Sequence, residues 1–165
     1  MDFDSLEIVD FSDDWAKDFA ALNYEWIEKY FAVEEHDREI LDRPREFVID
    51  PGGQIFMAII DGQAAGTVAL IPDGEDIMEL TKMAVSPNFQ GLGIGGKLMA
   101  RCIEYAKEPG IKTVFLESNR KLAPALNLYR KFGFVEVPGH PDSFYSRADI
   151  RMELDLTAQL IRTHE

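Results

Sequence analysis

The residues QGLGIGGKLM, numbered Gln90 to Met99, carry the information that decides the fold of this chain. Four glycines fall within the six residues 91–96, and a helical pattern follows directly. Glycine lets the backbone pass close to a ligand and turn its N–H groups inward. The first turn of a helix adds unpaired N–H donors and the positive end of the helix dipole. The stretch therefore predicts a site for a phosphate or pyrophosphate, and so a phosphorylated cofactor.

A dinucleotide-binding motif is the first interpretation of the glycines. Gly91, Gly93 and Gly96 fit G-x-G-x-x-G, and Glu117 stands about where a ribose-binding acid is expected. In that motif the glycines follow their strand through a tight turn, whereas residues 86–90 separate the strand from the glycines here. Only about 70 residues remain after the loop, too few for the further βα units of a dinucleotide fold.

Two other motifs fit the same residues. The P-loop pattern G-x-x-x-x-G-K-[ST] fits as far as Lys97, but Leu98 stands where a hydroxyl must reach magnesium. The third pattern, Q-x-x-G-x-G, begins at Gln90 and is complete.

This third pattern resembles the acyl-CoA loop of the GNAT superfamily of N-acetyltransferases. A strand ending in Lys82–Pro87 precedes the loop, and an amphipathic helix and the strand Thr113–Ser118 follow it. The segment Ala125–Phe134 contains Leu-Tyr-x-x-x-Gly-Phe, which is similar to the family's tyrosine-bearing helix and its entry into the next strand. The similarity covers about residues 54–154.

The resemblance implies a function. It implies an N-acetyltransferase that moves the acetyl group from acetyl-CoA to a primary amine by direct attack, with no metal and no covalent enzyme intermediate. A non-catalytic acyl-CoA-binding or regulatory domain is the alternative from another class. An oxidoreductase with a dinucleotide comes third, for the spacing reasons above.

The pattern of the chain predicts one α/β domain over residues 1–165, with a mixed sheet. Asp61-Gly62 predicts a hairpin turn, and Ser12 is expected to cap the first helix. The resemblance implies that the sheet is central and mostly antiparallel, flanked by helices, and that its fourth and fifth strands splay apart to admit the cofactor. Strands are expected near residues 6–11, 54–60, 63–70, 77–85, 113–118, 134–137 and 148–154, and helices near 12–30, 34–41, 94–108 and 124–132.

Glu79 is the candidate general base. It stands on the strand that leads to the glycine loop, and in some family members this place holds a catalytic glutamate. Strand alternation predicts that Glu79, Thr81, Met83 and Val85 share one face. A solvated or structural acid is the alternative interpretation.

Tyr129 is the candidate general acid. By helical period it belongs to an apolar stripe, which favours a structural role. The resemblance favours a functional one, because the hydroxyl of the family's tyrosine faces the sulfur of CoA.

The resemblance also assigns the cofactor contacts. Strand residues would hold the pantetheine arm, and backbone N–H groups of the glycine loop would hold the pyrophosphate. The family often has an asparagine seven residues before the tyrosine, where Leu122 stands here, while Asn119 lies ten before it. Either Asn119 reaches CoA through a longer connection or that contact is lost. The expected cofactor-binding residues are Met83, Ala84, Val85, Gln90, Gly91, Leu92, Gly93, Gly95, Gly96, Asn119 and Tyr129.

The acceptor side is less defined. The resemblance places it at the first two helices and the loop between the last strands. A carboxylate-bearing acceptor is favoured if Arg147 points into the pocket. The candidates there are Tyr24, Trp26, Tyr30, Phe31, Glu34, Glu35, Ser143, Tyr145 and Arg147.

Composition limits the partners. The net charge is −13, from 30 acidic and 17 basic residues, which disfavours nucleic acid and anionic membranes and favours a cationic small-molecule or peptide amine. The single Cys102 and three isolated histidines, His36, His140 and His164, predict no metal site. No signal-peptide pattern opens the sequence, so a cytoplasmic location is expected. A homodimer is left open.

Overall fold

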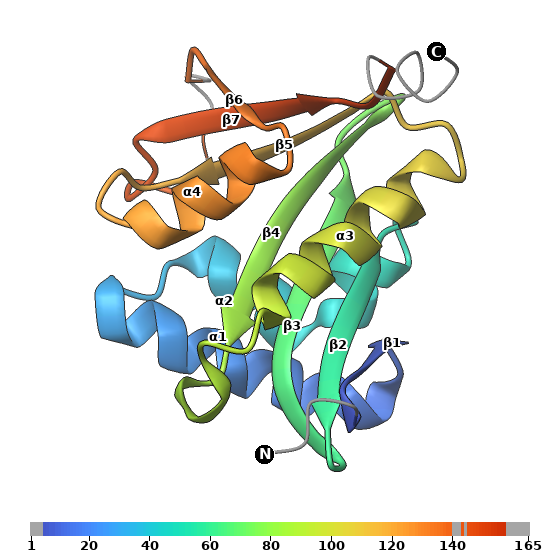
Figure 1. Ribbon diagram of the computed structural model, residues 1–165, viewed down its shortest axis with the longest axis vertical. Coiled ribbons are helices and arrows are strands. Elements are labelled where there is room, and N and C mark those ends of the chain that lie inside the picture. The colour runs from blue at the N-terminus through green and yellow to red at the C-terminus, as the bar shows by residue number, and fades with distance from the viewer. Residues whose placement is uncertain (1–4, 140–142, 144, 158–165) are drawn as a thin grey trace.

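The computed structural model describes residues 5–139, 143 and 145–157. Within them the strands form one seven-stranded sheet in the order β1-β2-β3-β4-β5-β7-β6 (Figure 1). Neighbouring strands are antiparallel except β4 and β5, which are parallel. The mixed, mostly antiparallel sheet is thus confirmed. The strands are β1 Glu7–Asp10, β2 Gln54–Ile60, β3 Gln63–Pro72, β4 Ile77–Val85, β5 Thr113–Ser118, β6 Val135–Val137 and β7 Ile150–Asp155.

Helices cover both faces of the sheet (Figure 1). The helices α1, Ala16–Tyr30, and α2, Glu35–Asp42, pack on one face, and α3, Ile94–Lys107, and α4, Ala123–Lys131, pack on the other. Each pair of helices buries its own hydrophobic cluster against the sheet. A short π-helical segment, Arg45–Ile49, was not predicted.

Of the turn and the helix cap predicted from the sequence, the structure confirms only the turn. Asp61 and Gly62 both have positive φ, 50° and 78°, as the predicted turn between β2 and β3 requires. The predicted cap at Ser12 is wrong, because its side chain makes no capping hydrogen bond and a 3-10 turn, Asp13–Trp15, comes first. Helix α2 begins with a capping box in which the Glu34 and Asp37 side chains bond each other's backbone N–H groups.

The strands β4 and β5 separate after a short pairing. Only Ile77–Glu79 of β4 align with Thr113–Phe115 of β5. Beyond Glu79 the two strands diverge, which confirms the predicted splay. The fork between them is where the cavity described below opens.

A β-bulge at Lys82 changes the face that β4 presents. Thr67 pairs with Ala84 and Ala69 with Thr81, so one residue of β3 faces two of β4. Lys82 has φ 55°, in the left-handed region that side chains other than glycine rarely adopt. The bulge therefore reverses the alternation of side chains between the two halves of β4.

The predicted common face of Glu79, Thr81, Met83 and Val85 is wrong for this reason. Glu79 and Thr81 lie opposite Ile71 and Ala69, which belong to the cluster under α1 and α2. Met83 and Val85 pack instead against the cluster under α3 and α4. These four side chains are therefore divided between the two faces of the sheet.

Close packing of α3 on β3 yields a first prediction. A Cβ at Gly66 would lie 2.9 Å from Ile94 Cγ2 and 3.3 Å from the carbonyl oxygen of Ala84. Gly66→Ala is expected to lower the free energy of unfolding by about 1–3 kcal/mol, because the contact forces α3 away from the sheet. Urea denaturation measures the change. Gly139→Ala is the control, since no heavy atom of the described residues lies within 4 Å of its added Cβ; an equal loss in both variants contradicts the prediction.

Candidate active site

A cavity of about 350 Å³ lies at the fork between β4 and β5. It reaches both faces of the sheet, so that elements from the two halves of the chain meet around it. The sheet contributes residues 79–85 of β4 and residues 116–119 at the end of β5. The other lining residues come from the helices and loops around the sheet: Asn23, Trp26, Ile27, Phe31, Gln90, Gly95, Leu122, Pro124, Ala125, Leu128, Tyr129, Tyr145, Arg147 and Ala148.

The glycine loop lies beside this cavity, and two of its glycines adopt the left-handed conformation. Gly91 and Gly93 have φ values of 81° and 75°, which glycine adopts freely. Gly93 is the N-cap of α3, so the free N–H groups of its first turn follow directly. Of the loop, Gln90 and Gly95 line the cavity, whereas Gly91, Leu92, Gly93 and Gly96 do not.

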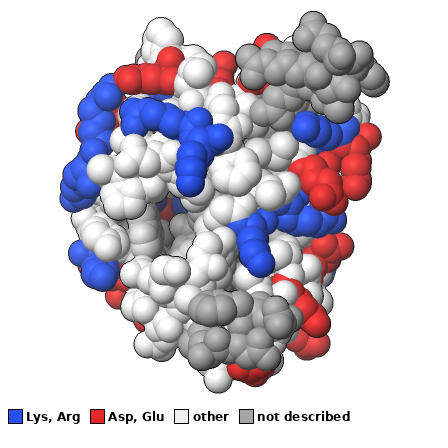
Figure 2. Space-filling model, viewed as in Figure 1, with Lys and Arg blue, Asp and Glu red and all other residues white. Residues whose placement is uncertain are grey.

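The surface over this region suits an anionic group. Figure 2 shows a hollow between α4 and the beginning of α3, with Lys and Arg side chains around it. This local basic character stands out against the net charge of −13. The predicted contacts Met83, Ala84 and Val85 of β4 line the same cavity.

Tyr129 of α4 reaches the cavity from the α3 and α4 side. Its side chain is buried, and its ring packs against Phe134 with the centroids 6.1 Å apart. Within the described part of the chain no hydrogen bond reaches its hydroxyl. Burial raises the pKa of Tyr129 to about 12, so the hydroxyl keeps its proton at neutral pH and is a donor.

Glu79 reaches the cavity at the fork itself, as the last residue of β4 paired with β5. Burial raises the pKa of Glu79 from 4.5 to about 7, and the charges of Glu117 and Asp73 act in the same direction. Lys82 and Arg151 oppose this rise. The carboxyl group is therefore able to take up and release a proton near neutral pH.

Asn119 lines the cavity but is held by the protein. Its Nδ2 donates to the carbonyl oxygen of Arg147 at 2.8 Å, and its Oδ1 accepts from the Lys121 backbone N–H at 2.9 Å. One N–H of the amide is left by these bonds. The side chain thus fastens the segment before β7 to the end of β5.

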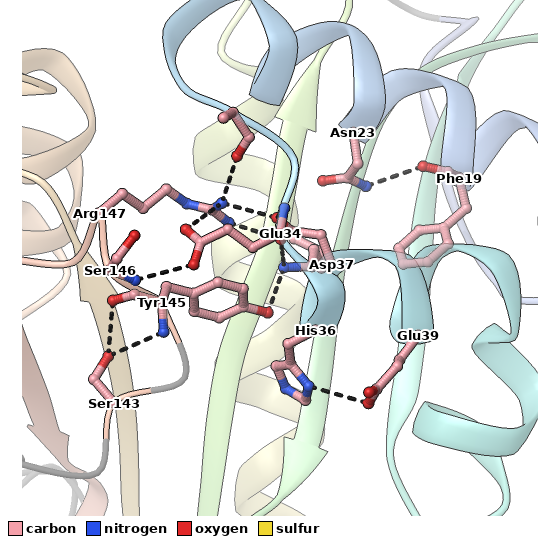
Figure 3. A network of polar contacts seen from close by, with 12 residues as sticks. Phe19, Asn23, Glu34, His36, Asp37, Glu39, Ser143, Tyr145, Ser146 and Arg147 are labelled. Carbon is pink, nitrogen blue, oxygen red and sulfur yellow. Dashed lines mark hydrogen bonds and ion pairs between the residues drawn. The ribbon is translucent and has the colours of Figure 1, made fainter.

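The side of the cavity that faces α1 and α2 contains a buried network of polar side chains that was not predicted (Figure 3). Lys82 Nζ donates to Asp37 Oδ1 and to the Tyr145 hydroxyl, each at 2.8 Å. Arg147 binds both oxygens of Asp37, at 2.7 and 2.8 Å. The side chains of Lys82 and Asp37 are 3% and 0% exposed, so this is an ion pair removed from water.

The pKa values of the network follow from this arrangement. Burial alone would raise the pKa of Asp37, but its hydrogen bonds from Arg147 and the charge of Lys82 hold that pKa well below its usual range. Burial lowers the pKa of Lys82, and Asp37 opposes that shift. Burial raises the pKa of Tyr145, with Asp37 and Glu79 adding to the rise. Asp37 is thus the fixed negative charge of the network.

A sequence signal for this network existed. By alternation Lys82 falls on the buried stripe of Met78 and Leu80, where a lysine is out of place unless it is paired. Nothing in the sequence indicated its partner, because Asp37 lies 45 residues away.

Cys102 is buried in the core and does not line the cavity. Among the described residues no group of three or more His, Cys, Asp or Glu side chains is placed to hold a metal ion. His140 and His164 lie outside the described residues. No helix in the described ranges has the length and apolar character needed to cross a membrane.

Residues 14–134 match the acetyltransferase (GNAT) family. The chain belongs to this family. Enzymes of the GNAT family use acetyl-CoA as the acetyl donor, and the described domain is accordingly an acetyl-CoA-dependent N-acetyltransferase domain.

Curated relatives carry the same activity in their names. The probable N-acetyltransferase camello of Xenopus tropicalis is 31% identical over 99 residues, which cover 59% of this chain and 45% of that protein. An uncharacterized N-acetyltransferase of Schizosaccharomyces pombe is 28% identical over 121 residues, 71% of this chain and 74% of the relative. The chain thus spans less than half of the first of these relatives.

Solved structures share the fold. A GNAT-family acetyltransferase of Staphylococcus aureus superposes with a TM-score of 0.84 at 23% identity, over 92% of this chain and 99% of that one. A putative acetyltransferase of Salmonella typhimurium, solved with acetyl-CoA, gives 0.71 at 19% identity, over 92% and 94% of the two chains. These likenesses establish the GNAT fold of the described domain.

The raised pKa of Glu79 yields a prediction about stability. In the unfolded chain Glu79 ionises above its ordinary pKa of 4.5, whereas burial holds its proton in the folded chain up to about 7. Ionisation therefore favours the unfolded state as the pH rises through this window, and the loss persists above it. Because Glu79→Gln cannot ionise, it is expected to be more stable than wild type by about 2 kcal/mol at about pH 8, after allowance for screening by water, and by little at about pH 4.

Urea denaturation at the two pH values measures this difference. The exposed Glu75→Gln is the matched control and is expected to show no such dependence on pH. An equal offset between Glu79→Gln and wild type at both pH values would contradict the raised pKa.

Proposed function

We propose that this chain transfers the acetyl group from acetyl-CoA to a protonated, cationic primary amine by direct attack. The observation that carries the proposal is the placement of Glu79 and Tyr129 at one cavity, where β4 and β5 separate. Glu79 belongs to the half of β4 that faces α1 and α2, and Tyr129 comes from α4 on the other face. A base on the acceptor side and an acid on the cofactor side are what such a transfer requires.

The first requirement is a neutral amine. An alkylamine has a pKa near 10.4, so its deprotonation at pH 7 costs about 4–5 kcal/mol. Glu79 supports the proposal as general base, because its pKa of about 7 lets it accept this proton, directly or through a water, and release it to solvent.

The second requirement concerns the leaving sulfur. Tyr129 supports the proposal as general acid, because its buried hydroxyl is protonated at neutral pH and faces the cavity without a hydrogen bond from the described residues. Its O–H can donate to the thiolate as the bond to the acetyl group breaks.

The cofactor fits the residues on the α3 and α4 side. Acetyl-CoA supplies the thioester, and the left-handed glycines of the loop leave open space for its pyrophosphate at the first turn of α3. Backbone groups of Met83 to Val85 would hold the pantetheine arm. Among the described residues no partner takes the second N–H of the Asn119 amide, which supports a contact with CoA.

The charges of the acceptor side favour a cationic amine. Arg147 lines the cavity, which by itself would favour a carboxylate on the acceptor. Its guanidinium, however, is bound by Asp37 through two hydrogen bonds and by Glu34 at 3.3 Å. The cation is therefore neutralised, and the carboxylates of Glu79 and Glu117 are left to face the acceptor.

One experiment tests the proposed function as a whole. Release of the CoA thiol is measured across a panel of polyamines, amino acids, aminoglycosides and peptide amines, with calorimetry of acetyl-CoA and NAD binding in the absence of magnesium. Acetyl-CoA binding together with release of CoA on a cationic amine is expected. Binding without release on any amine would favour a non-catalytic acyl-CoA-binding domain, and tight binding of NAD alone would contradict the assignment.

Tyr129→Phe tests the general acid. The substitution removes one hydroxyl and keeps the ring that packs on Phe134. Turnover is expected to fall by about 10²–10⁴-fold, with little change in acetyl-CoA affinity or thermal stability. Tyr105→Phe is the matched control, because that ring packs edge-on against Phe56 in the core and is expected to leave turnover unchanged. Normal turnover in Tyr129→Phe would assign Tyr129 a purely structural role.

Glu79→Gln tests the general base through its dependence on pH. In wild type kcat/KM is expected to rise through about pH 7, as Glu79 loses its proton. In Glu79→Gln this rise of kcat/KM with pH should be absent. The ratio of its kcat/KM to that of wild type should be lowest just above neutral pH. The defect should shrink at high pH, where the amine in solution is already neutral. Profiles that run parallel at every pH would exclude Glu79 as the base.

A further inference from the structure

Two cations of the buried network line the cavity, and the carboxylates that balance them do not. Lys82 and Arg147 are among the lining residues, whereas Asp37 and Glu34 are absent from the wall. Arg147 is paired with both of these acids, and Lys82 with Asp37. The acceptor therefore meets cations whose charge is already cancelled from within the protein.

The wall of the cavity formed by Glu79 and Glu117 has a different balance of charge. Glu79 and Glu117 line the cavity from β4 and β5, and Ser143 Oγ donates to the Glu117 carboxylate. Arg151, which stacks over Phe115 at 3.9 Å, is paired with Glu153 at 3.4 Å. The unbalanced charge of this wall is therefore negative.

Asp37 is the residue of the buried network that neutralises Lys82 and Arg147. It is fully buried and accepts from both cations, and its Oδ2 also accepts from the Glu34 backbone N–H at 2.8 Å, which fixes it at the start of α2. Removal of its charge would leave one uncompensated positive charge beside the acceptor. At a distance of about 8 Å and an effective dielectric constant of about 20, one charge changes the binding of an ammonium group by tenfold or more.

We propose that Asp37 determines the charge specificity of the acceptor site: by neutralising Lys82 and Arg147, it makes the cavity select a diamine or polyamine over an amine that carries a carboxylate. Asp37 acts through the two cations and does not touch the acceptor, so it is a positioning residue. The inference rests on the proposed function, because it assumes that the acceptor occupies this cavity.

Two probes of equal carbon count separate the charges. Putrescine and γ-aminobutyrate each carry a primary amine on a four-carbon chain. The other end of putrescine is an ammonium group, and the other end of γ-aminobutyrate is a carboxylate. Their affinities for the protein saturated with CoA are measured by calorimetry, so that no turnover is needed. Wild type is expected to bind putrescine more tightly than γ-aminobutyrate.

Three variants then change the charge in steps. Asp37→Asn removes one negative charge, which leaves a net positive charge in the network. It is expected to weaken the binding of putrescine by about tenfold and to strengthen the binding of γ-aminobutyrate. Lys82→Met removes one positive charge and is expected to bind putrescine at least as tightly as wild type. The double variant Asp37→Asn/Lys82→Met restores the balance and is expected to return the ratio of the two affinities toward wild type. A network that only holds the fold would instead be weakened by every one of these changes.

Asp13→Asn is the matched control. It breaks an Asp–Arg pair of 2.8 Å with Arg45, in which both side chains are exposed, and is expected to leave both affinities unchanged. Thermal melts and acetyl-CoA affinity confirm that each variant is folded, and if Asp37→Asn does not fold, Lys82→Met and the double variant decide.

The outcomes separate this inference from the proposed function. Equal loss of putrescine binding in Asp37→Asn and Lys82→Met, no putrescine binding by wild type, or tighter binding of γ-aminobutyrate by wild type would each overturn the inference. Selective binding of putrescine without any acetyl transfer would refute the proposed function and leave the inference standing.

Discussion

The buried ion pair between Lys82 and Asp37 is the interaction on which the site depends. It ties a bulged strand in the middle of the sheet to the first turn of α2, and the Tyr145 hydroxyl joins it from the segment before β7. A lysine with φ 55° is strained, and such a conformation persists only where its surroundings hold it. Removal of Asp37 would leave the buried ammonium group of Lys82 without its counter-charge, which costs more than the pair itself. Removal of Lys82 leaves Asp37 bound by Arg147.

The bulge that this pair holds changes which face of the sheet the side chains of β4 point to. Before it, Glu79 and Thr81 face the α1 and α2 side, and after it, Met83 and Val85 face the α3 and α4 side. The separation of β4 from β5 opens a passage between these two faces at the same level. In the proposed mechanism, the base for the acceptor and the backbone groups for the cofactor therefore lie only a few residues apart on one strand.

Two carboxyl groups near the cavity show how environment divides their roles. Glu79 is half-buried with few compensating contacts, so its pKa rises to about 7 and it can exchange a proton. Asp37 is more deeply buried, yet two cations and a backbone N–H bind it, so its pKa falls and it remains charged. Burial without partners suits a group that takes up a proton, and burial with partners suits one that supplies a constant field.

The sequence by itself determined the order of the elements and the glycine loop before α3, because turn chemistry and hydrophobic period are local properties. Its motifs indicated the family by resemblance. It also indicated Glu79 and Tyr129, which the structure places at one cavity. It did not determine the cap of α1, the bulge at Lys82, the reversal of faces along β4 or the pairing of Lys82 with Asp37. These were decided by tertiary structure, because an unpaired charge in the core is prohibitive and its partner comes from a distant segment that only the fold brings near.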